Sequence, residues 1–298
     1  MSREFTIESG GMEFGISLTK HDARIYYGNS ELSDFMRMGF VPHKEESMPD
    51  LEKRVGEVRD NYGRLLKTGE YRETPADMQK EFLRRYGVEL SGRVLIKDNS
   101  SSENAKRLIL KNAKGKAYLL DNVGIVEVIS TFEKNTKLFM HEAMHCVFDD
   151  NPFVREEVSK HWKWFYYGDR FPLPMLYSRL DKAHIFNEML PAAFLDQMVS
   201  SVCPFPAYPG VPWLAVMFGS EAVYEGTNNL FFDYFSKALA LSYAARIPRS
   251  FANLARGKLY KHRITKLRKM LCDKNAMKLM MVSSPDSLKQ IIREAEKL

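Results

Sequence analysis

The segment from Leu138 to Val147 constrains the fold more than any other part of the chain. Its sequence is Leu-Phe-Met-His-Glu-Ala-Met-His-Cys-Val, so Glu142 is its only acid and it has no lysine or arginine. Just before it, Ser130 and Glu133 have the spacing of a capping box, which predicts a helix that continues to about Phe148. A helix with so few charges must be buried. Its two histidines and glutamate must then find partners, because unpaired buried polar groups are costly.

Strand patterns fill the region before this helix. Apolar and β-branched runs predict strands at 94–96, 107–111, 116–120 and 125–129, and the residues 112–115, Asn-Ala-Lys-Gly, have the composition of a hairpin turn. After Pro152 the pattern is helical, apart from loops rich in proline and aromatic residues. We therefore predict an α+β fold. An antiparallel or mixed sheet should pack on the 130–148 helix, and the C-terminal half should be mostly helical.

The N-terminal part is a mixed region with no recognisable chemistry. Apolar residues alternate on both sides of Ser9-Gly10-Gly11, which predicts a β-hairpin. A strongly charged helical pattern covers 49–66. Thr74 and Pro75 then supply an N-cap and a first-turn proline for a helix that Gly87 ends.

The cysteines are too few and too widely spaced for a disulfide framework. Cys146, Cys203 and Cys272 form no CxxC pair, which disfavours a zinc site built from cysteines and fits a reducing compartment. The first residues lack the apolar run of a signal peptide, and no apolar stretch is long enough to span a bilayer. We expect a soluble, cytoplasmic protein with no transmembrane segment.

His141 and His145 are four residues apart, which places both imidazoles on one face of a helix. There they can bind a single zinc ion, Zn2+, at about 2.0–2.1 Å. Glu142 adjoins the first histidine and can reach a water on the metal without being a ligand itself. Zinc lowers the pKa of such a water and polarises a carbonyl, while the carboxylate accepts the proton. The pattern predicts hydrolysis of an amide without a covalent intermediate.

With the residues His141-Glu142-Ala143-Met144-His145, the sequence resembles the zincin metallopeptidases. The resemblance covers about 94–198 and includes the predicted sheet before the motif helix and the helices after it. The metzincin branch requires a glycine and a histidine where this chain has Phe148 and Asn151, so that branch is excluded. The resemblance implies a zinc metallopeptidase, a hydrolase of proteins or peptides in which Glu142 is the general base.

A catalytic zinc ion needs a third protein ligand. Glu188, in an Asn-Glu pair on a downstream helix, looks like the third-ligand segment of the gluzincin branch, which includes the thermolysin-like enzymes. His184 lies four residues earlier, on the same helical face, and competes for this role. His161 and the aspartates are further alternatives.

The sequence departs from the gluzincin pattern at one position. Enzymes of that branch often carry an acid four residues after the glutamate, which orients a zinc-bound histidine. Here that position is Ala192, and Asp149 and Asp196 are the available substitutes. We divide the chain into an N-terminal mixed α/β region over 1–90 and a zincin-like catalytic region over 91–298, with a helical, basic C-terminal part.

Positive charge gathers in the segment 246–278, which contains eleven lysines and arginines and one acid, Asp273. Such a run is either a solvated helical face or a surface for an anionic partner, such as a membrane surface, a nucleic acid or an acidic protein. The alternative to an enzyme is therefore a non-catalytic, zincin-like interaction protein that binds through this basic segment. The absence of an acid at Ala192 supports that alternative, because a catalytic gluzincin often carries an acid there. Glu142 argues against it, because a structural zinc site needs no general base.

Overall fold

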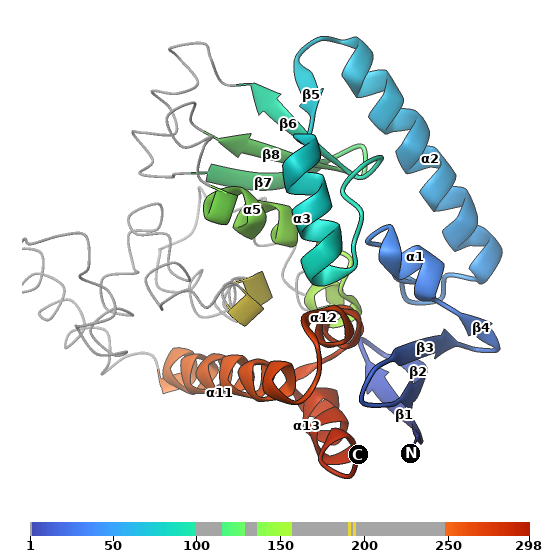
Figure 1. Cartoon of the computed structure of the whole chain (residues 1–298), viewed down its shortest axis with the longest axis vertical. Coiled ribbons are helices and arrows are strands. Elements are labelled where there is room, and N and C mark those ends of the chain that lie inside the picture. The colour runs from blue at the N-terminus through green and yellow to red at the C-terminus, as the bar shows by residue number, and fades with distance from the viewer. Residues whose placement is uncertain (1, 99–114, 129–135, 157–189, 192, 195–247) are drawn as a thin grey trace, which may run out of the picture.

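A computed structural model describes residues 2–98, 115–128, 136–156, 190–191, 193–194 and 248–298 (Figure 1). These residues form two four-stranded sheets with helices packed around them. The predicted α+β class is confirmed at this level. None of the described helices is long and apolar enough to cross a membrane.

The first sheet is an antiparallel meander at the N-terminus. Its strands follow one another in the order β1 (Arg3–Ser9), β2 (Met12–Leu18), β3 (Ala23–Tyr27) and β4 (Ser30–Glu31). The predicted hairpin is confirmed, because Ser9 pairs with Met12 and the intervening glycines have φ of +60° and +72°. Gly10 is also required sterically, since a Cβ atom there would lie 2.6 Å from the carbonyl oxygen of Pro152.

The second sheet is mixed and has the order β5-β6-β8-β7. Its strands are β5 (Tyr71–Glu73), β6 (Val94–Asp98), β7 (Gly115–Leu120) and β8 (Val123–Val128). Strands β6 and β8 are parallel, and the other two pairings are antiparallel. Because consecutive residues 94–96 and 123–126 are all buried, both central strands are covered on both faces.

A hairpin turn that the sequence reading missed joins β7 to β8. Asp121 and Asn122 form it with φ of +51° and +63°, the left-handed conformation that a type I′ turn requires at both central positions. The sequence signal for this turn was the Asp-Asn pair itself, because both residue types tolerate the left-handed conformation. The strand predicted at 107–111 lies outside the described residues, as does most of the turn predicted at 112–115, of which Gly115 is the first residue of β7.

The N-terminal helices are α1 (Ser33–Arg37), α2 (Met48–Lys67) and α3 (Ala76–Tyr86). Helix α2 confirms the helix predicted at 49–66, and Gly87 ends α3 as predicted, with φ of +74°. The prediction for the start of α3 was wrong. Pro75 occupies the N-cap position, and the Thr74 hydroxyl instead donates to the carbonyl oxygen of Val94 at 3.2 Å. The Thr74 hydroxyl therefore bonds to β6 and does not cap α3.

The described C-terminal helices return to the N-terminal part of the chain. They are α11 (Pro248–Met270), α12 (Asp273–Met281) and α13 (Pro285–Ala295). Helix α12 packs against α3 and β3, and α13 packs against α11 and β1. The Gln290 side chain donates to the carbonyl oxygen of Thr6 at 2.7 Å, and the two termini lie together (Figure 1). The described residues after Pro152 contain no strand, in agreement with the predicted helical half.

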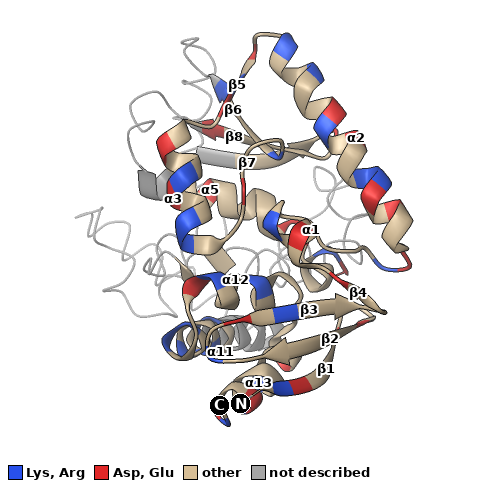
Figure 2. Cartoon of the chain, turned by 45° about the vertical axis from the view of Figure 1, so that its right-hand side comes forward, with Lys and Arg blue, Asp and Glu red and all other residues tan. Residues whose placement is uncertain are grey.

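The described part of the basic segment 246–278 lies on α11 and α12, where Figure 2 marks lysine and arginine in blue. Three of its cations form intramolecular ion pairs: Lys266 with Glu296, Arg268 with Asp273 and Lys278 with Asp22. Lys269 and Lys274 are exposed and form no ion pair among the described residues. Part of the positive charge therefore stabilises the fold, and Lys269 and Lys274 are exposed cations that an anionic partner could meet.

Candidate metal centre

The motif lies on α5 (Thr136–Phe148), which packs against β7 and β8. The predicted buried helix is confirmed over these residues; its predicted first turn lies outside the described residues. Met144 and Cys146 are fully buried. The helix approaches β8 so closely that a Cβ atom added at Gly124 would lie 2.7 Å from the Cβ and 2.9 Å from the Sγ of Cys146. Gly124 thus sets the distance between the sheet and the helix that carries both histidines.

A buried ion-pair network anchors the C-terminal end of α5. The Asp150 carboxylate accepts from Arg93 at 2.5 Å and from Arg155 at 2.8 Å. His43 and Arg54 approach the same carboxylate at 3.3 Å and 3.6 Å. Burial by itself would raise the pKa of Asp150. The charges of its arginine neighbours and the hydrogen bond to His43 outweigh burial and hold the pKa well below its usual range, so this carboxylate stays ionised.

Arg93 is the link in this network between the sheet and the motif helix. Its side chain is almost completely buried, and its guanidinium lies over the Phe40 ring, 4.3 Å from the centroid. The guanidinium donates to the carbonyl oxygens of Asn122 at 2.7 Å and Cys146 at 3.3 Å. It therefore contacts both the β7–β8 turn and the last turn of α5. The sequence reading missed it because Arg93 and Asp150 are 57 residues apart, and no local pattern marks such a pair.

The two histidines of the motif converge on one point. His141 and His145 are 6% and 8% exposed, and their Nε2 atoms are 3.0 Å apart. Their rings meet edge to face at an angle of 77°. Two nitrogen ligands at about 2.0–2.1 Å from a tetrahedral ion lie roughly 3.3 Å apart, so the spacing needs only a small adjustment to hold zinc. The same spacing also suits a hydrogen bond from a protonated Nε2 to an unprotonated one.

Two carboxylates accompany the histidines. Glu142 is 8% exposed and directly follows His141 on the same helix. Asp149 follows one turn after His145, and its backbone amide donates to the His145 carbonyl oxygen at 2.9 Å. Burial raises the pKa of Asp149, and the charge of His145 opposes that rise. Asp149 and His145 therefore interact electrostatically. An acid that replaces the one missing at Ala192 must be near a histidine of the site, and Asp149 meets this requirement.

The remaining ligand candidates lie outside the described residues. These are Glu188, His184, His161 and Asp196, together with Ala192. Among the described residues, no group of three or more histidine, cysteine, aspartate or glutamate side chains forms a metal-binding set. The short helical segment that follows Glu188 is described in part. Phe194 packs against Phe148 with ring centroids 5.9 Å apart, which brings the chain six residues after Glu188 to the end of α5.

Comparison of the chain with protein-family models, with curated proteins and with solved structures gave no match.

Proposed function

We propose that this protein is a zinc-dependent peptidase in which His141, His145 and Glu188 hold the metal and Glu142 is the general base. One observation carries the proposal: two imidazole Nε2 atoms lie 3.0 Å apart on a buried helix that also carries the buried Glu142. Burying two histidines and a glutamate together has a substantial desolvation cost. A metal ion that accepts both imidazole lone pairs would offset that cost.

The surroundings of the pair support a zincin-like arrangement. A mixed sheet packs on α5, as the resemblance implies, and the described chain beyond the motif is helical. Phe194 holds the segment after Glu188 against Phe148, at the end of the helix that carries the motif.

The residues divide the chemical work. Zinc, when bound, supplies Lewis acidity that lowers the pKa of a water and polarises the substrate carbonyl. Glu142 accepts a proton from the attacking water and later delivers it to the nitrogen of the leaving amine. The buried position of Glu142 limits competing hydrogen bonds from bulk water. Arg93 and Gly124 act only through the fold, because they fix α5 against the sheet.

The proposal is tested by metal content and proteolysis together. The purified protein should contain about one zinc per chain, and His145→Ala should lose it. Glu142→Gln should retain the metal and the folded state but cleave a denatured protein substrate several orders of magnitude more slowly, since it removes the base and no ligand. Equal cleavage by wild type and Glu142→Gln would exclude this mechanism, and zinc retained by His145→Ala would place the metal elsewhere.

A further inference from the structure

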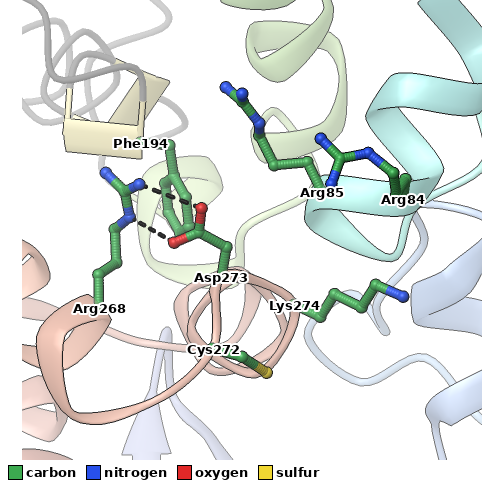
Figure 3. Close-up of a pocket in the computed structure, with 7 residues that line it drawn as sticks. All are labelled: Arg84, Arg85, Phe194, Arg268, Cys272, Asp273 and Lys274. Carbon is green, nitrogen blue, oxygen red and sulfur yellow. Dashed lines mark hydrogen bonds and ion pairs between the residues drawn. The ribbon is translucent and has the colours of Figure 1, made fainter.

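A basic pocket separate from the histidine pair lies between the C-terminal end of α3 and the N-terminal end of α12. Its volume is about 500 Å³. Figure 3 shows its lining: Arg84, Arg85, Phe194, Arg268, Cys272, Asp273 and Lys274. Arg84 and Arg85 come from the last turn of α3, on the side of the pocket where Lys274 lies, and Arg268 faces Asp273 across from them.

Positive charge exceeds negative charge in this pocket. Glu81, beside the pocket, pairs with Arg84 at 2.8 Å and with Arg85 at 3.4 Å, so one carboxylate serves two guanidinium groups. Asp273 is fully engaged by Arg268, with two contacts of 2.8 Å and 3.1 Å. Lys274 forms no ion pair among the described residues. The four cations of the lining therefore face two acids, which leaves a surplus of two positive charges.

Further hydrogen-bond donors near the pocket come from the start of α12 and from Tyr86. Helix α12 begins after Cys272, whose side chain makes no capping hydrogen bond, so the first-turn amides of α12 are left without a side-chain acceptor. The Tyr86 hydroxyl is buried and makes no hydrogen bond of normal geometry, although Arg85 lies beside it. The Tyr86 ring packs edge to face against Phe194, with ring centroids 5.9 Å apart, and Phe194 lines the pocket, so Tyr86 lies beside it.

We infer that this pocket binds the phosphate group of a small organic phosphate. A phosphomonoester dianion matches the surplus of two positive charges, and guanidinium groups and the amides at a helix N-terminus are the donors that bind phosphate oxygens best. The volume of about 500 Å³ exceeds that of a bare phosphate ion and lies in the range of small-molecule sites. Two of the cations, Arg268 and Lys274, belong to the basic segment 246–278, so the inference gives that charge a defined ligand class. It goes beyond the proposed peptidase and does not depend on it.

Calorimetric titration at constant ionic strength tests the inference, with inorganic phosphate and phenyl phosphate as probes. The wild type should bind one equivalent of each, and phenyl phosphate should bind at least as tightly as inorganic phosphate because the pocket has room for the ester. Lys274→Ala removes an exposed cation without disturbing the core and should weaken binding about tenfold or more. Lys269→Ala is the matched control, because Lys269 is also exposed but does not line the pocket.

Three results would overturn the inference. They are the absence of binding by the wild type at about 10 mM of either probe, equal weakening by Lys274→Ala and Lys269→Ala, and tighter binding of inorganic phosphate than of phenyl phosphate. Glu142→Gln should bind both probes like the wild type. The phosphate site can therefore be confirmed or refuted independently of the peptidase mechanism, because Glu142→Gln changes only the latter.

Discussion

Replacing Gly124 by alanine should force α5 away from β8. The new Cβ atom would lie 2.7 Å from the Cβ of Cys146, 2.9 Å from its Sγ and 3.2 Å from a methyl group of Val94. Carbon atoms in contact need about 3.5–4.0 Å, so the helix must move by roughly 1 Å or the strand must bend. Overpacking of this kind in a filled core costs about 1–3 kcal/mol. Because α5 carries both histidines, the same displacement should weaken zinc binding.

Chemical denaturation of Gly124→Ala and of the wild type measures this cost, and zinc titration of the folded variant measures its effect on the site. Gly56→Ala is a control of opposite sign. Gly56 is exposed in the interior of α2, and a Cβ atom there would meet nothing within 4 Å. Alanine at that position should stabilise the protein by about 0.5–1 kcal/mol, through helix propensity alone. A Gly124→Ala variant as stable as the wild type, with unchanged zinc affinity, would refute the close approach of α5 to β8.

Two further predictions concern the anchor of α5 and the third ligand. Asp150→Asn should cost about 3–5 kcal/mol in denaturation experiments, because it leaves the buried charges of Arg93 and Arg54 without their carboxylate. The folded-state pKa of Asp150 is depressed, so its contribution to stability is present above about pH 4 and is lost as the pH falls below that value. The variant should therefore lose less stability on acidification than the wild type, and parallel pH profiles would contradict this. Glu188→Ala should lower zinc affinity strongly and abolish proteolysis, whereas His184→Ala should keep the metal and reduce the rate by a smaller factor. The reverse pattern in metal analysis and proteolysis would make His184 the ligand.

Local signals in the sequence were the ones that could be interpreted correctly. The four-residue spacing of His141 and His145 predicted that their rings share a helix face, and Gly87 marked the end of α3, because both depend only on neighbouring backbone. Thr74 failed as an N-cap because the carbonyl of Val94, 20 residues away, accepts its hydroxyl hydrogen bond.

Non-local contacts explain the other omissions. The Arg93–Asp150 pair joins residues 57 positions apart, and each is an ordinary charged residue in its own sequence neighbourhood. From the sequence alone, Gly124 is only a glycine that weakens a strand. Its role in the close packing of α5 on β8 depends on Cys146, which is distant in the sequence. Tertiary contacts of this kind position the histidine pair, and a single sequence contains no periodic pattern that reveals them.

X-ray absorption at the zinc edge of the purified, zinc-loaded protein tests the central claim most directly. We expect nitrogen and oxygen neighbours at about 2.0–2.2 Å, with the multiple scattering of two imidazole rings and no sulfur neighbour. In His145→Ala the signature of one imidazole should disappear from whatever metal remains. A sulfur neighbour at about 2.3 Å, or a spectrum without imidazole scattering, would contradict the assignment of the metal to His141 and His145.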